Sequence, residues 1–326
     1  MRDFIFNRTS HEPMYGFAED ARRHLSSSLQ AMAALEPEDG DLPRFRCSFD
    51  PWMTALVEGQ GELPPTSLGD VVMSMFDTGD HDVASYFIAL ETMTPPDRGF
   101  DDAMEDAALR IVPQRPVNGF EATFDAVNHS PFDAVLCAVS DAILVSLPRH
   151  EIWMHDRLAF ATDQIEYGFD HVACPEHAAA ISERKTAGIR TGLTARSFWQ
   201  LRDSAFPNLL FGPDVEGQMA IFSADKLPLL FRRFADLDAR VLRWRALPPG
   251  AAFPEAVPEI APESTATMKN YTTDRTFRSA NGSRRVFEDH VRVDSLYRVH
   301  LFRDTDAKTL EIGYVGRHLP NVTSAT

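Results

Sequence analysis

An asparagine–glycine pair, Asn281-Gly282, constrains the fold of this 326-residue chain more than any other feature. It is the strongest short-range signal for a tight β-hairpin, because both residues readily adopt the positive φ angles of such a turn. Hydrophobic and polar residues then alternate over 284–293 and 297–303. This period of two is typical of strands that bury a single face. The C-terminal part therefore predicts a four-stranded antiparallel meander, whose outer strands are expected at 274–279 and 308–315.

Charge separates this C-terminal part from the rest of the chain. The segment from Lys269 to His318 has 10 Lys/Arg against 7 Asp/Glu, a net charge of +3. The whole chain has a net charge of −16, so the remainder carries −19. Phosphate contacts need positive charge, and the acidic body is therefore not expected to wrap nucleic acid. A surface that handles anions is expected at the C-terminus.

Composition restricts the cellular compartment in which the protein is expected. No apolar run approaches the roughly 20 residues that span a bilayer, so no membrane partner is predicted. The N-terminal residues lack the apolar core of a signal peptide, so export is not expected. Three cysteines, an odd number, fit free thiols in a reducing compartment. Together these features predict a cytoplasmic protein.

Five prolines between Ala246 and Ala266 predict an extended linker without helix or strand. The sequence thus predicts an α+β fold in four parts: an acidic, mainly helical domain at 1–149, an α/β domain at 150–245, the linker at 246–266 and the antiparallel sheet module at 267–326. Apolar spacing and cap residues predict the individual elements. Helices are expected at 17–35, 67–75, 81–93, 101–111, the first part of 132–147, 175–185, 194–204 and 225–245, and short strands at 142–147 and 168–173.

The predicted sheet gathers groups that could act on a phosphate. Side chains two residues apart on a strand leave the same face, so Arg298 accompanies His300 and His290 accompanies Arg292. Arginine binds phosphate through two parallel hydrogen bonds, and histidine exchanges a proton near neutral pH. RNA cleavage without a metal ion needs a base, an acid and a cation, which these residue types supply. The catalytic candidates are Arg292, Arg298, His300 and Tyr314, and the phosphate- or RNA-binding candidates are Arg284, Arg285, His290, Arg317 and His318.

The alternative interpretation is a solvated polar face, whose cations pair with Glu288, Asp289 and Glu311. Metal and cofactor chemistry have weaker signals. His150 and His155, or His171, Cys174 and His177, could offer metal ligands, but a second Cys/His pair is missing for zinc. Neither a Walker nor a dinucleotide glycine loop occurs in the sequence. No metal and no cofactor are therefore predicted.

Two stretches carry a resemblance to a known family: Tyr297-Arg-Val-His-Leu-Phe302, and Leu310-Glu-Ile-Gly-Tyr-Val-Gly-Arg-His-Leu319 after a short acidic turn. They resemble the C-terminal sheet of RelE-type toxins, and also uncharacterised bacterial proteins associated with antiviral defence loci. The resemblance covers about fifty residues. RelE-type toxins are small ribonucleases with Arg, Lys, Tyr or His on a sheet surface, so it implies RNA as the ligand and Arg292, Arg298, His300 and Tyr314 as catalytic residues.

Two functional hypotheses follow. In the first, the chain is a component of a bacterial antiviral defence or toxin–antitoxin system with an RNA-cleaving C-terminal module. In the second, it is a non-enzymatic accessory or adaptor protein, whose acidic body binds a protein partner and whose sheet docks it. The proline-rich segment directly before the sheet and the acidic body both depart from the RelE pattern, and they keep the second hypothesis open.

Overall fold

The structure is a computed structural model. Residue contacts divide the chain into two compact units. Unit 1 comprises Met1–Asp102 and Val112–Leu193, and unit 2 comprises Ala103–Ile111 and Thr194–Thr326. The structure describes residues 3–11, 14–35, 44–93, 102–111, 115–116, 132–162, 165–187, 192–256 and 258–322.

Unit 1 is built on a six-stranded mixed sheet with the strand order β2-β1-β6-β8-β7-β5. The pairs from β2 to β8 are parallel, and the last two pairs are antiparallel. β1 and β6 consist wholly of buried apolar residues, as is usual for parallel strands covered on both faces. The strands are β1 (Phe4–Phe6), β2 (Phe45–Cys47), β5 (Arg115–Pro116), β6 (Ile143–Val145), β7 (Arg157–Thr162) and β8 (Ile165–Val172).

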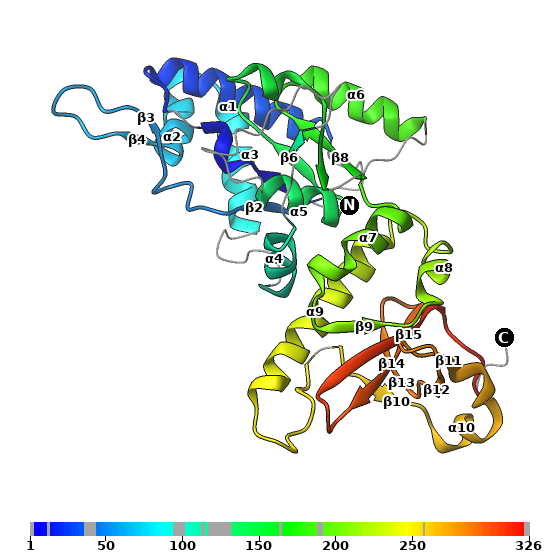
Figure 1. Cartoon of the computed structure of the whole chain (residues 1–326). Coiled ribbons are helices and arrows are strands. Elements are labelled where there is room, and N and C mark those ends of the chain that lie inside the picture. The colour runs from blue at the N-terminus through cyan, green and yellow to red at the C-terminus, as the bar shows by residue number, and fades with distance from the viewer. Residues whose placement is uncertain are drawn as a thin grey trace. The chain divides into compact units, whose positions relative to one another are not determined.

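Helices cover the sheet of unit 1, with α1 and α6 on one side and α5 on the other (Figure 1). The side chain of Ser67 and that of Asp70 form a capping box that fixes the start of α2. A separate hairpin of β3 (Ala55–Val57) and β4 (Thr66–Ser67) extends beside these helices. The helices are α1 (Ala18–Ala33), α2 (Leu68–Thr78), α3 (His81–Met93), α5 (Phe132–Ser140) and α6 (Pro175–Thr186), with 3-10 turns η1 (Arg8–His11) and η2 (Glu151–Met154).

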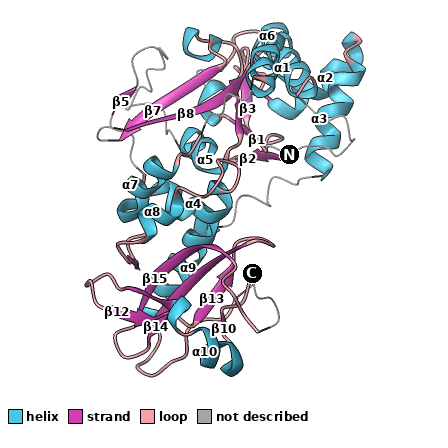
Figure 2. Cartoon of the chain, turned by 90° about the vertical axis from the view of Figure 1, so that its right-hand side faces the viewer, coloured by secondary structure: helices cyan, strands magenta, loops and turns pink. Residues whose placement is uncertain are grey.

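Unit 2 contains a five-stranded sheet with the order β10-β13-β14-β15-β9, in which β13, β14 and β15 run side by side (Figure 2). All pairs are antiparallel except β15–β9. A separate hairpin, β11–β12, turns at Asn281-Gly282, where Gly282 has a φ of +85°. The strands are β9 (Leu209–Phe211), β10 (Ala261–Pro262), β11 (Thr276–Arg278), β12 (Arg284–Val286), β13 (Asp289–Arg292), β14 (Tyr297–Asp304) and β15 (Thr309–Arg317).

The apolar stripe of α9 (Leu227–Ala246) packs in the core of unit 2, with Phe231, Phe234 and Trp244 all buried. Thr194 caps α7 (Ala195–Ala205) through a capping box with Ser197, as the sequence predicts. The other helical segments of unit 2 are α4 (Asp102–Leu109), α8 (Val215–Met219), α10 (Thr265–Tyr271) and the 3-10 turn η3 (Thr273–Arg275).

The fold is α+β, and the C-terminal strands β10, β13, β14 and β15 pair antiparallel as predicted. The predicted four-stranded meander is not formed, because its first strand belongs to the separate β11–β12 hairpin. The two units differ from the predicted domain ranges 1–149, 150–245 and 267–326, because the structural boundary falls between Leu193 and Thr194. Strands β6 and β8 complete the sheet that β1 and β2 begin, which joins the first two predicted domains. In the same way, α9 packs on β9, which pairs with the C-terminal sheet.

The linker prediction for 246–266 is wrong at the segment's C-terminal end. The chain has no helix or strand over the described residues 247–256 and 258–260, but Ala261–Pro262 forms β10 and α10 starts at Thr265. β10 is an edge strand, where a proline is tolerated because its missing N–H faces away from the ladder.

The predicted strand 284–293 is divided into β12, which pairs with β11, and β13, which pairs with β10 and β14. The backbone N–H of Phe287 donates to the carbonyl of Arg275 in the register of the β11–β12 ladder, so the chain changes sheets after this residue. The four residues predicted to face the core, Phe287, Val291, Val299 and Leu301, are all fully buried. The prediction that Arg298 and His300 lie on a solvated face is wrong, because both are buried as well.

The second face is covered by segments that the alternation could not reveal. The ring of Phe277 from the β11–β12 hairpin stacks on Tyr314 with centroids 4.9 Å apart. Ser279 donates to Glu311, and Arg275 donates to the carbonyl of Pro320 near the C-terminus. The sheet of unit 2 therefore has protein on both faces.

Among the described residues, no helix is both long and apolar enough to cross a membrane.

Candidate functional site in unit 2

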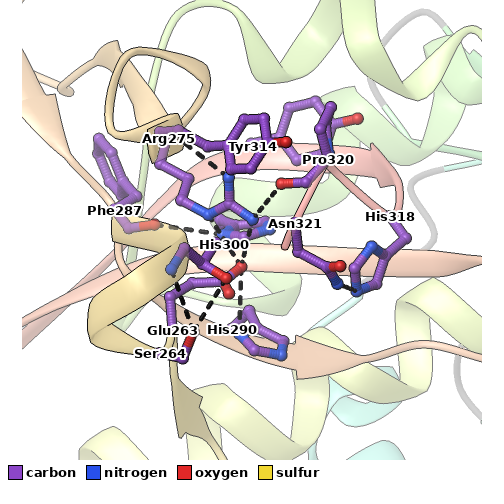
Figure 3. A network of polar contacts seen from close by, with 12 residues as sticks. Glu263, Ser264, Arg275, Phe287, His290, His300, Tyr314, His318, Pro320 and Asn321 are labelled. Carbon is purple, nitrogen blue, oxygen red and sulfur yellow. Dashed lines mark hydrogen bonds and ion pairs between the residues drawn. The ribbon is translucent and has the colours of Figure 1, made fainter. Parts of the chain in front are cut away.

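The covered face of the β13–β15 sheet carries three adjacent rings. His290 on β13 lies opposite His300 on β14, and His300 lies opposite Tyr314 on β15. The ring centroids of the two histidines are 5.4 Å apart, and those of His300 and Tyr314 are 5.7 Å apart. The sheet register therefore brings together two of the predicted catalytic residues and one predicted RNA-binding residue (Figure 3).

His300 lies at the centre of this group and is inaccessible, with 1% of its surface exposed. Its Nδ1 lies 3.2 Å from the carbonyl oxygen of Phe287, which can only accept, so Nδ1 carries the proton. Burial, with a smaller contribution from the neighbouring His290, lowers the pKa of His300 to about 3. His300 is therefore a neutral imidazole that cannot touch a substrate, contrary to the predicted catalytic role.

A buried ion pair lies beside the imidazoles. Arg275 is fully buried and donates Nε and Nη2 to one oxygen of Glu263, at 2.9 and 2.7 Å. Its remaining donors go to the carbonyl of Pro320 at 2.9 Å and that of Tyr271 at 3.3 Å. The sequence did not single out either partner of this pair.

His290 is the partly accessible histidine of the sheet, with 18% of its side chain exposed. Its Nδ1 lies 3.9 Å from the Glu263 oxygen that Arg275 also contacts. Burial lowers the pKa of His290, and the charges of Arg298 and Arg275 add to this, whereas the Glu263 carboxylate opposes it. The net result favours the neutral imidazole, which can accept a proton.

The C-terminal segment brings a third imidazole to the group. His318 lies near enough to lower the pKa of His290 and of His300 by charge repulsion. Its Nε2 lies 3.5 Å from Nδ2 of Asn321. The Tyr314 hydroxyl donates to the carbonyl of Arg317 at 3.0 Å, and burial raises the pKa of this phenol. Both His318 and Tyr314 are partly exposed. Figure 3 shows them beside the sheet histidines.

Arg298 is a buried cation without a carboxylate partner. Its side chain is 7% exposed, and its Nη1 donates to the backbone carbonyls of Asp294 and Tyr297 at 2.7 and 2.9 Å. The carboxylate of Asp294 is instead paired with Lys226 at 3.0 Å. Within the described ranges, Arg298 forms no ion pair and its buried Nε no hydrogen bond. Burial and the charge of Arg292 on the adjacent strand lower its pKa.

The other predicted cations divide into two groups. Arg298 lies opposite Arg292 on β13 and opposite Gly316, the residue before Arg317, on β15. Arg292 and Arg317 therefore lie at the same end of the sheet as Arg298, and both are exposed. Arg284 and Arg285 belong to the β11–β12 hairpin. Arg285 lies over the Phe302 ring at 4.1 Å and 3.5 Å from Glu311, so it has the acidic partner that the alternative interpretation expects.

The histidines and cysteine considered as metal ligands belong to no group of three or more His, Cys, Asp or Glu side chains that could hold an ion in the described part of the chain. His171 and His177 do lie close together in unit 1, with ring centroids 5.6 Å apart. His171 is fully buried, and burial lowers its pKa to about 3. The nearby carboxylates of Asp156 and Asp170 form ion pairs with Arg184. The two histidines therefore lie in a packed, structural environment.

Comparison with known protein families, curated proteins and solved structures found no match in any of the three. Sequence reasoning missed Glu263 and Arg275, and local signals for them are weak. Glu263 ends a proline-rich segment, and Arg275 precedes a strand, so only the fold brings these residues together across eleven intervening positions.

Proposed function

We propose that unit 2 binds RNA at the end of the sheet where Arg292, Arg298 and Arg317 lie, and cleaves it without a metal ion. In this proposal the chain is a cytoplasmic component of a bacterial antiviral defence or toxin–antitoxin system. The observation that carries the proposal is the buried guanidinium of Arg298, which has no carboxylate partner in the described structure. A buried charge without a counter-ion is strongly unfavourable, and a bound anion would relieve it.

The surroundings of Arg298 favour a phosphate as that anion. Arg292 lies opposite on the adjacent strand, and Arg317 is exposed at the same end of the sheet. Guanidinium groups bind phosphate oxygens through paired hydrogen bonds, and exposed cations draw a polyanion to the surface. The acidic remainder of the chain repels RNA, which confines binding to this region.

Proton transfer is assigned to His290 and His318 in place of the predicted His300, which is buried. The ribose 2′-hydroxyl attacks the phosphorus while neutral His290 takes its proton. The bond from phosphorus to the 5′-oxygen breaks, and His318 supplies a proton to that oxygen. The products are a 2′,3′-cyclic phosphate and a 5′-hydroxyl. Both histidines are partly exposed and lie close together, as general acid–base catalysis requires.

RNA binding by the full chain tests the proposal. Fluorescence anisotropy with a labelled single-stranded RNA should show binding that weakens with salt. Arg298→Gln should reduce the affinity by about 10- to 100-fold, the value of a charged hydrogen-bonded contact. Arg243→Gln is the matched control, since Arg243 is an exposed arginine on α9. Equal affinity of Arg298→Gln and wild type, or no RNA binding at all, would contradict the proposal.

The accessory-protein hypothesis is the second candidate, and a feature of unit 1 favours it. Phe17 and Leu63 are large apolar side chains that are strongly exposed. Gln60, in the loop that joins β3 and β4, donates to the carbonyl of Gly16, so this loop lies beside the start of α1. Exposed apolar side chains close together are typical of protein-binding surfaces. If RNA binding fails while Leu63→Asp abolishes protection of cells against phage, this hypothesis replaces the first.

A further inference from the structure

The Glu263–Arg275 ion pair is the most deeply buried polar contact near the imidazoles. Arg275 is fully buried, and 8% of the Glu263 side chain is exposed. Taking both charges out of water is expensive, and apolar side chains of similar size often stabilise a protein as well or better. Stability alone therefore does not explain why this buried ion pair is present, and its contacts suggest another role.

Arg275 connects three segments that have no regular hydrogen-bond ladder between them. Its guanidinium contacts Glu263 directly after β10, Tyr271 at the end of α10, and Pro320 in the C-terminal segment. The backbone N–H of Glu263 donates to the carbonyl of Glu288, directly before β13. The carboxylate is thereby fixed relative to the strand that carries His290.

One carboxylate oxygen of Glu263 lies close to both Arg275 and His290. It accepts two hydrogen bonds from Arg275 and lies 3.9 Å from Nδ1 of His290. This Nδ1 is buried and makes no hydrogen bond to the described residues. Glu263 is the group whose negative charge opposes the effect of burial on His290. On the other side of Arg275, the contact with Pro320 holds the segment that carries His318.

We infer that Glu263 and Arg275 are positioning residues, which place His290 and the segment bearing His318 for proton transfer to and from a phosphodiester. This inference rests on the proposed function, because it gives the pair a role in that reaction. The Glu263 carboxylate acts on His290 by its charge, across 3.9 Å to Nδ1 and without a hydrogen bond, and Nε2 is left for the substrate. A carboxylate close to a histidine base favours the imidazolium that forms when the base takes its proton.

The electrostatic consequence can be measured without RNA. The charged or titratable groups with the largest effects on the pKa of His290 are Glu263, Arg298, His318 and Arg275, and Glu263 is the anion of this set. The ring of His300 lies 5.4 Å from that of His290. Glu263→Gln keeps the shape of the side chain and removes its charge. We expect the pKa of His290 to fall further, by about half a unit or more, because the group that favours the imidazolium is gone.

The experiment is an NMR titration of the histidine rings in the full chain, with Glu288→Gln as the matched control. Glu288 is an exposed glutamate two residues before His290. It should leave the titration of His290 unchanged, and Glu263→Asp should largely preserve it. A merely structural ion pair would lower the stability of Glu263→Gln without shifting His290 in the molecules that remain folded. An unshifted His290 in this variant would overturn the inference.

Arg275→Lys provides a second measurement, in case Glu263→Gln does not fold. Lysine keeps the charge but cannot contact Glu263, Tyr271 and Pro320 together. Amide exchange of His318, whose N–H donates to Leu296, should become at least tenfold faster. Unchanged exchange would contradict the role of Arg275. Since neither readout involves RNA, failure of RNA binding and failure of the positioning role are separate results.

Discussion

Arg275 and Glu263 are twelve residues apart in sequence and form a bifurcated contact, with two guanidinium nitrogens on one carboxylate oxygen. Loss of either partner leaves an uncompensated buried charge, so Arg275→Met should lower the free energy of unfolding by about 3–5 kcal/mol. The double variant Arg275→Met, Glu263→Leu should recover most of this loss. Urea unfolding of the wild type, Arg275→Met and the double variant measures these free energies. A double variant no more stable than Arg275→Met would contradict the explanation.

Arg298 should behave in the opposite way, because it forms no ion pair with the described residues and the nearby Asp294 carboxylate, which is paired with Lys226, offsets its charge only in part. Arg298→Met removes an unfavourable buried charge together with two hydrogen bonds to carbonyls. We expect a change in unfolding free energy within about 1 kcal/mol. RNA affinity should nevertheless fall as in Arg298→Gln. Destabilisation comparable to that of Arg275→Met would show that Arg298 serves the fold.

Gly313 supports the site through close packing. It lies at the bulge where the β14–β15 register shifts, and a Cβ atom there would approach the ring of Phe287 to 2.6 Å. Phe287 is fully buried and cannot move aside, so Gly313→Ala should cost about 1–3 kcal/mol. Gly217→Ala is the control, because nothing lies within 4 Å of its added methyl group and it is in helix α8. Thermal unfolding should show that only Gly313→Ala is destabilised.

Acid should destabilise the protein through its buried histidines. His300 and His171 have folded pKa values of about 3, whereas the pKa of an unfolded histidine is near 6.5. The unfolded chain therefore binds more protons below pH 6.5, and stability falls as the pH decreases toward 3. Each residue contributes about 1.4 kcal/mol per pH unit inside this window. His300→Asn should flatten the pH dependence measured by urea unfolding between pH 7 and 5, and the exposed His81→Gln should leave it unchanged.

Local sequence signals were sufficient for much of unit 2. Asn281-Gly282 does form the turn between β11 and β12, and the alternation around Val291 and Val299 gives the correct pairing and core face. Helix α9 and its stripe follow from the 3.6-residue period. Strands β6 and β8 of unit 1 match the strands predicted at 142–147 and 168–173. Strands β1 and β2 have three residues each, which is too short to show any period, so they were missed.

The burial of His300 illustrates what alternation cannot tell. A period of two identifies residues that share a face, but whether a hairpin and a C-terminal segment cover that face depends on distant contacts such as Arg275 to Pro320. The same limit hid the Glu263–Arg275 pair. Site residue types were predictable from the strand pattern, whereas their accessibility, and hence their role, required the structure.

The most direct test of the account is cleavage of RNA by the full chain in the presence of EDTA. Both free RNA and ribosome-bound RNA should be used, with analysis of the product ends. The account predicts 2′,3′-cyclic phosphate and 5′-hydroxyl ends, and a loss of about 10²- to 10⁴-fold in rate for His290→Gln and for His318→Gln. His81→Gln should match the wild type. No cleavage by the wild type, or undiminished cleavage by His290→Gln, would contradict the account.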